Sequence, residues 1–151
     1  AYINSLKGSM VQELNLSNCS LNYVPSEVAN LMNLKSINLS NNNIVGLTDA
    51  LCKLPNLVNL NLSNNKLENL PEAFAMMRSL RNLNLSNNRL KLLPMGMSSL
   101  NLENYDISGN DLQTGIVATE PAVEYAKPVR KYYVKNSAGK TKRASRKKIR
   151  R

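Results

Sequence analysis

Residues 57–67 read LVNLNLSNNKL, and this eleven-residue phrase returns almost unchanged along the chain. The other copies are VQELNLSNCSL at 11–21, LKSINLSNNNI at 34–44, LRNLNLSNNRL at 80–90 and, more loosely, LENYDISGNDL at 102–112. The first four copies start 23 residues apart, and the fifth follows after 22. A fixed period of this length is typical of a solenoid, because one unit cannot bury its apolar face alone and must stack on its neighbours.

Each phrase predicts one strand followed by a sharp turn. The alternation of Leu60 and Leu62 has the period of a half-buried strand, so these leucines should point inward and the residues between them should face an open, concave side. An amide side chain three positions later can satisfy backbone groups of the turn. We therefore expect a structural ladder along the solenoid, with a cysteine in the first unit; its members are Cys19, Asn42, Asn65, Asn88 and Asn110.

The segments between the phrases carry apolar residues every three or four positions and predict short helical or 3-10 turns on the convex side. Pro25, Pro71 and Pro94 preset one backbone angle near the start of three of these segments. Thr48 takes the place of proline in the remaining one. Four methionines of these segments should fill gaps in the core; they are Met76, Met77, Met95 and Met97.

The 23-residue repeat length and the Leu-Pro start of the return segments resemble the short intracellular class of leucine-rich repeat proteins. That class includes the Ras-suppressor and Scribble-type (LAP) proteins and the plant intracellular Ras-group repeat proteins. The resemblance covers residues 11–112. It implies an α/β leucine-rich repeat solenoid: a right-handed arc with a parallel concave sheet, short helical or 3-10 turns on the convex side, and a role in binding another protein.

Four regions follow from this pattern. Residues 1–10 would form a weak N-terminal cap, residues 11–112 the five repeats, residues 113–126 a C-terminal cover and residues 127–151 a basic tail. Stacked repeats need polar caps because the outer units otherwise expose half a core, and neither end carries a recognisable one. Either the chain is a piece of a longer array, or its ends meet a partner.

The basic charge belongs to the tail. Residues 1–126 hold 8 Lys and Arg against 10 Asp and Glu, whereas residues 127–151 hold 12 Lys and Arg and no acid. Like charges at this density predict disorder. The residues that would bind anions or direct nuclear import are Lys140, Lys142, Arg143, Arg146, Lys147, Lys148, Arg150 and Arg151.

Four interpretations of the tail stay open. It resembles a nuclear localisation signal. It could bind nucleic-acid phosphates, with Tyr132 and Tyr133 available for stacking. It could lie on an anionic membrane surface, or it could only aid solubility. Ser145 follows basic residues in the pattern of a basophilic kinase site, and phosphorylation there would weaken any anion binding.

The composition argues against an enzyme. The chain has no histidine, the usual base near neutral pH. Cys19 and Cys52 occupy positions that we expect to face inward, where a thiol is unreactive. The acidic residues form no pair, and no glycine-rich phosphate loop is present. We therefore expect no catalysis, cofactor, metal or small-molecule ligand.

The sequence favours the cytoplasm or nucleus. The two cysteines lie in different parts of the repeat, where disulfide geometry is unfavourable. No apolar stretch is long enough to span a membrane, and no signal-peptide pattern opens the chain. In a secreted chain, several Asn-x-Ser sequons would put glycans across the concave face; the sequon asparagines are Asn15, Asn18, Asn38, Asn61 and Asn84.

The concave face is the candidate binding site. It is polar and rich in amides, with Arg81 and Tyr105 closest in type to the residues that dominate protein interfaces, although Tyr105 replaces an inward leucine and should join the core. A column of serines, Ser17 to Ser108, should accompany it. The candidate residues are Glu13, Asn15, Ser36, Asn38, Asn59, Asn61, Arg81, Asn82, Asn84, Asn104 and Asp106.

Two interpretations of this face stay open: the amides hydrogen-bond an extended peptide or a polar loop, or they are solvated residues copied by repeat duplication. The leading hypothesis is a non-catalytic scaffold or adaptor that binds a protein partner on the concave or edge surface. The alternative is a nuclear or ribonucleoprotein-associated factor held to nucleic acid by residues 127–151. A third is the recognition piece of a larger ubiquitin-ligase or signalling assembly.

Overall fold

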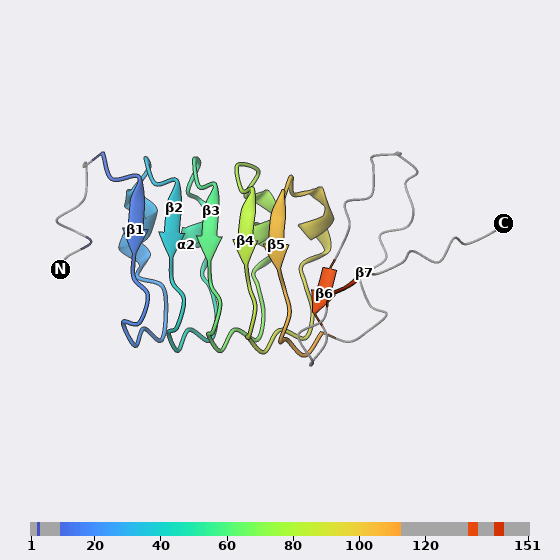
Figure 1. Cartoon of the computed structure of the whole chain (residues 1–151). Helices are drawn as coiled ribbons and strands as arrows, with labels where there is room; N and C mark the ends of the chain where they lie inside the picture. Colours follow the sequence, from blue (N-terminus) through green and yellow to red (C-terminus); the bar gives the residue numbers. More distant parts are fainter. Residues whose placement is uncertain (1–2, 4–9, 113–132, 136–140, 144–151) are drawn as a thin grey trace.

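The computed structural model describes residues 3, 10–112, 133–135 and 141–143. Five short strands form one parallel sheet in chain order, each beside the strand of the next unit (Figure 1). In register, Leu14 lies opposite Ile37, and Leu60 lies opposite Leu83. The predicted solenoid is confirmed. The strands are β1 (Glu13–Asn15), β2 (Ser36–Asn38), β3 (Asn59–Asn61), β4 (Asn82–Asn84) and β5 (Asn104–Asp106).

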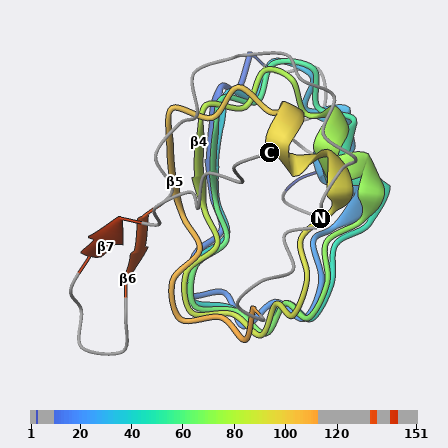
Figure 2. The same cartoon turned by 90° about the vertical axis from the view of Figure 1, so that its right-hand side faces the viewer.

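The return segments form single helical turns on the side of the cross-section opposite the sheet (Figure 2). A proline precedes each 3-10 helix, as predicted. Where Thr48 replaces the proline, the turn is α-helical instead. The turns are η1 (Ser26–Asn30), α2 (Asp49–Cys52), η2 (Glu72–Met76) and η3 (Met95–Ser99).

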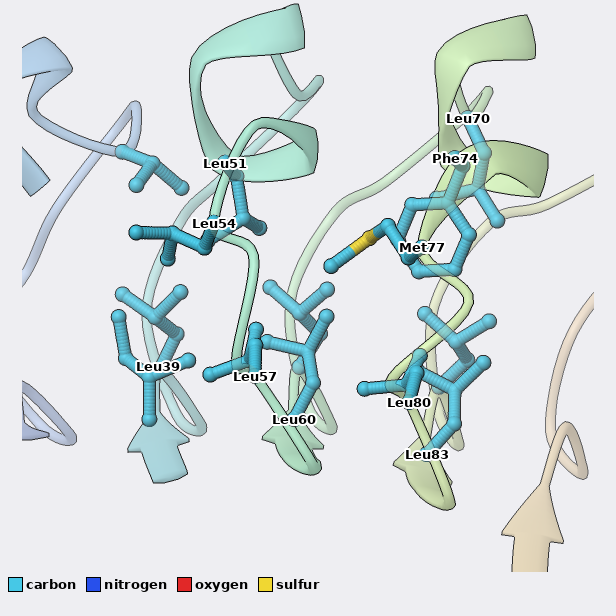
Figure 3. Close-up of a cluster of buried hydrophobic side chains, with 14 of the residues drawn as sticks. Leu39, Leu51, Leu54, Leu57, Leu60, Leu70, Phe74, Met77, Leu80 and Leu83 are labelled. Atoms are coloured by element: carbon cyan, nitrogen blue, oxygen red, sulfur yellow. The ribbon is translucent and has the colours of Figure 1, made fainter. Parts of the chain in front are cut away.

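The core fills the space between the sheet and these turns (Figure 3). Leu60 and Leu83 enter it from the strands, and Phe74 and Met77 enter it from the convex side. Phe74 is completely buried. Burial of each such side chain contributes about 1.5–3 kcal/mol. Because the same positions recur in every unit, the core is one continuous cluster along the array.

The asparagine ladder is confirmed. The Nδ2 of Asn65 donates to the carbonyl oxygens of Leu39 and Leu62 at 2.9 and 3.1 Å, and its Oδ1 accepts from the backbone N–H of Ile44 at 3.0 Å. Each amide therefore joins its own turn to the unit before it. The same pattern recurs at Asn42, Asn88 and Asn110.

The sequence predicts that four methionines of the return segments fill the core, and this prediction is wrong for two of them. Met77 is buried and Met97 is half-buried against the core, but Met76 is 66% exposed and Met95 is 56% exposed. Met76 ends η2 and Met95 begins η3, and a single helical turn directs only some of its residues inward.

The ends are described only in part. Ile3 packs half-buried against the core, whereas Met10 is 76% exposed. The other residues of the predicted N-terminal cap, and the whole predicted cover at 113–126, lie outside the described residues. Where the sequence predicts disorder, β6 (Tyr133–Lys135) pairs antiparallel with β7 (Thr141–Arg143). The rest of the tail also lies outside the described residues.

Candidate functional site

The side chains that point away from the core form the concave face, defined here by the outward residues of β1 to β5. A shallow, open depression of about 490 Å³ lies over it. Glu13 and Asn15 continue the same columns on β1, beyond the depression. The predicted residues that line the depression are Ser36, Asn38, Asn59, Asn61, Asn82, Asn84, Asn104 and Asp106.

The central column of this face consists of side chains whose oxygens are already engaged. The Oδ1 of Asn61 accepts hydrogen bonds from the backbone N–H of Ser63 at 3.0 Å and from its hydroxyl at 2.8 Å. The Oδ1 of Asp106 accepts from the backbone N–H of Ser108 at 2.9 Å. The remaining members bond in the same way to the serine two residues later; they are Asn15, Asn38 and Asn84.

The nitrogens of this central column are free to meet a ligand. Within the described residues, no hydrogen bond involves the Nδ2 of Asn38, Asn61 or Asn84. These three side chains are half-buried at their base, and the adjoining depression is open to solvent. Each of these three units therefore offers one amide donor group at the same height on the face.

In the neighbouring column, the amides of Asn59, Asn82 and Asn104 form hydrogen bonds with one another. The Nδ2 of Asn82 donates to the Oδ1 of Asn59 at 2.6 Å, and the Nδ2 of Asn104 donates to the Oδ1 of Asn82 at 2.7 Å. These residues are register partners in adjacent strands, so their amides stack along the array. This ladder stiffens the face beside the central column.

The predicted serine column does not belong to the binding surface in the middle of the array. Ser40 and Ser63 are each 6% exposed and Ser86 is 8% exposed. The chain turns immediately after each strand, and the carbonyl of Ser63 accepts from the N–H of Asn41 at 3.0 Å. The close approach of consecutive turns buries these hydroxyls, so the serines orient the asparagines rather than face a ligand.

Two larger residues differ from the prediction, Arg81 in its position and Tyr105 in how far it is buried. The Nη1 of Arg81 donates to the carbonyls of Arg78 and Leu80 at 2.9 and 3.0 Å, and its Nε lies 4.0 Å from the Oε1 of Glu103. Arg81 is thus held at the margin just before β4, and it does not line the depression. Tyr105 packs against the core as predicted, but it is only half-buried and also lines the depression.

Comparison with known proteins agrees with this geometry. A family profile described as "Leucine rich repeat" matches residues 9–67, and a second profile described as "Leucine Rich Repeat" matches residues 79–100. Together they cover more than half of the chain. The chain belongs to the leucine-rich repeat family. Proteins of this family generally mediate protein–protein interaction and are typically non-catalytic.

Among the solved structures that are similar to this leucine-rich repeat protein are the following two. A leucine-rich repeat protein from Leptospira interrogans is 27% identical, with a TM-score of 0.55 over 72% of this chain and 34% of that one. The BIR2 ectodomain from Arabidopsis thaliana is 31% identical, with a TM-score of 0.54 over 66% of this chain and 50% of that one. The chain thus spans a third to a half of their lengths, and no curated protein matches it.

The cysteines of this leucine-rich repeat protein differ from the expectation. Cys19 is exposed, because it occupies the ladder position in the first unit, on the outer side of the sheet's edge strand β1. Cys52 is half-buried, and burial, with a smaller effect from the charge of Asp49, raises its thiol pKa to about 11. Cys52 is therefore protonated at neutral pH and is a poor nucleophile.

The remaining predictions concern metals, membranes and the tail. In the described part of the chain, no three metal-ligating side chains gather, and none of its helices is long and apolar enough to cross a bilayer. Lys142 and Arg143 belong to β7. The other predicted anion-binding residues of the tail, and the predicted phosphorylation site at Ser145, lie outside the described residues.

Proposed function

We propose that this leucine-rich repeat protein is a non-catalytic scaffold or adaptor that binds a protein partner on its concave face. The observation that carries the proposal is the row of outward amide donors across consecutive strands, beside an open depression. The edge of the sheet is the second surface that such a partner could contact.

The test is to block the concave face without removing a hydrogen bond. Ser36 lines the depression, and within the described residues its side chain forms no hydrogen bond, so Ser36→Trp adds bulk at little structural cost. Met76→Trp adds similar bulk on the exposed convex side and is the matched control. A partner identified by affinity purification and mass spectrometry should be lost with Ser36→Trp and retained with Met76→Trp. The reverse pattern would exclude the concave face.

We further propose that the protein acts in the cytoplasm or nucleus. The proposal is supported by the sequons, because Asn38 and Asn61 lie in the middle of the concave face, where a glycan would cover it. Fluorescence microscopy of a tagged chain in its source cells should show cytoplasmic or nuclear signal. Glycans at these asparagines in protein isolated from those cells would contradict the proposal.

A second candidate function is binding to nucleic acid through the tail. The observation that favours it is the 12 basic residues without an acid at 127–151. Counterion release makes such binding strongly dependent on salt. Retention on immobilised RNA should fall as salt rises and should vanish when residues 127–151 are deleted. Retention that survives the deletion would exclude the tail as the binding element.

A further inference from the structure

We propose that the central column binds an extended peptide segment in one fixed orientation. The column consists of Asn15, Asn38, Asn61, Asn84 and Asp106. The four amides would donate to backbone carbonyls of the partner, and Asp106 would receive a cationic group at one end. The inference rests on the proposed function, since it names what the concave face recognises.

The four amides act only as donors. Three of their Oδ1 atoms, in Asn15, Asn61 and Asn84, accept both the backbone N–H and the hydroxyl of the following serine, so both lone pairs are used. The Oδ1 of Asn38 accepts the N–H of Ser40 at 3.0 Å. What each side chain presents on the concave face is therefore an NH₂ group whose direction is set by its own turn.

The spacing of the row suits an extended chain that runs along the array. Neighbouring strands of a sheet lie about 4.8 Å apart, so four donors span about 14 Å. Carbonyls on one side of an extended peptide recur about every 6.7 Å, that is, every second residue. About three carbonyls therefore fit over four donors. Because the amides are already oriented, little side-chain entropy is lost on binding.

The fifth position gives the row its direction. Asp106 stands where the other units have asparagine, and its Oδ1 makes the same turn bond, to Ser108, at 2.9 Å. Its second oxygen replaces an amide donor by a charged acceptor. Glu103 adds a second carboxylate near this end, although it is partly paired with Arg81 at 4.0 Å. A lysine, arginine or terminal ammonium of the partner would be placed over β5.

The same chemistry disfavours other ligands. A glycan hydroxyl can accept from these amides, but it also donates, and the amide oxygens that would receive that hydrogen bond are occupied. A phosphate needs cations, yet no Lys or Arg lines the depression, and Asp106 would repel it. Peptide carbonyls followed by a cation match both the donors and the terminal acid.

Asn61→Asp is a clean test because Asp106 shows that the fold accommodates aspartate at this position. The variant keeps the acceptor for Ser63 and turns the outward donor into a charged acceptor. Asn61→Ser is a neutral second variant, since a hydroxyl can also accept from the backbone two residues later. Asp106→Asn extends the donor row and removes the terminal charge. Thermal unfolding by circular dichroism checks that each variant is folded.

The probe is a library of random twelve-residue linear peptides displayed on phage and selected on the immobilised full chain. Selected peptides are synthesised, and their affinities are measured by fluorescence anisotropy. We expect enrichment of a basic residue at one end of the binding segment. Asn61→Asp should weaken binding by about tenfold or more, and Asn61→Ser by about threefold to tenfold. Asp106→Asn should abolish the preference for the basic residue over alanine at that end.

The outcomes separate this inference from the proposed function. If Ser36→Trp blocks the peptides while Asn61→Asp leaves their affinity unchanged, the concave site stands and the donor row is wrong. Peptides that ignore both substitutions would count against both proposals. If no peptide is enriched, the proposal that the central column binds extended peptides is overturned. The pull-down with Ser36→Trp still decides the proposed function.

Discussion

Asparagine has two different tasks at neighbouring positions of one unit. Asn61 points outward, and its nitrogen forms no hydrogen bond within the described residues, whereas Asn65 is 8% exposed and uses both amide atoms on the backbone. The difference follows from the turn. An amide enclosed by carbonyls from two units has no access to water, and its donors must be satisfied inside.

Replacing Asn65 with alanine should therefore be costly. The carbonyls of Leu39 and Leu62 and the N–H of Ile44 would lose their partner inside the protein. We expect the free energy of unfolding to fall by about 3 kcal/mol, measured by urea denaturation. Cys19→Ala changes the same ladder position at the exposed end and should cost less than about 1 kcal/mol. Equal losses would show that the ladder does not stabilise the interior.

The cysteines should differ in reactivity. The thiol of Cys52 has a pKa of about 11, above the ordinary value of 9.0, so its thiolate gains population only as pH rises towards 11. In the native protein at pH 8, iodoacetamide should modify the exposed Cys19 well before Cys52, as measured by peptide mass spectrometry. The rate at Cys52 should rise steeply between pH 8 and 11. Rapid modification of Cys52 at pH 8 would contradict the effect of burial.

At the scale of elements, small residues allow η2 and η3 to pack closely. A Cβ atom added to Gly96 would lie 2.5 Å from the Cβ of Ala75, which is too close for two carbons. The helical periodicity predicts the two turns, but nothing in the spacing of their apolar residues reveals this approach. The point of contact between two consecutive return segments depends on how both segments pack, so it cannot be deduced from the sequence of either one.

Gly96→Leu should force these two turns apart. We expect a loss of about 1–3 kcal/mol in the free energy of unfolding, because the added side chain overpacks the contact with Ala75. Gly46→Ala is the control: nothing lies within 4 Å of the added Cβ, so stability should change by less than about 0.5 kcal/mol. Thermal and urea unfolding give both values. A neutral Gly96→Leu would show that η3 can move freely.

For the whole molecule, stability comes from contacts between adjacent units. The central strand β3 pairs with β2 and β4, whereas among the described residues β1 pairs only with β2. A solenoid has no contacts between distant units, so a broken middle unit leaves two short pieces without a shared core.

Asn59→Pro should therefore disrupt the entire array. It removes the hydrogen bond from the N–H of Asn59 to the carbonyl of Lys35, which is 2.9 Å long, and should cost about 3 kcal/mol or more. Glu13→Pro, in the edge strand, should cost less than half as much. Hydrogen exchange should show lost protection at both Ile37 and Leu83 in the first variant. Protection retained on either side of β3 would contradict this coupling.

The sequence by itself determined the number of units, the inward leucines and the asparagine ladder. A strict period carries this information, since each position keeps the same side of the coil in every unit. It also located most of the residues that line the depression. The apolar spacing also predicted helical or 3-10 return turns, but only the structure showed that the turn with Thr48 in place of proline is α-helical.

Only the tertiary structure decided which polar atoms remain available. The burial of Ser63, the exposure of Cys19 and the saturated oxygen of Asn61 depend on how closely neighbouring turns approach and on where the stack ends. A repeating pattern treats every unit as equivalent. Hydrogen bonds and burial differ between units because they are set by distances to adjacent units, and within the described residues β1 and β5 each pair with a strand on one side only.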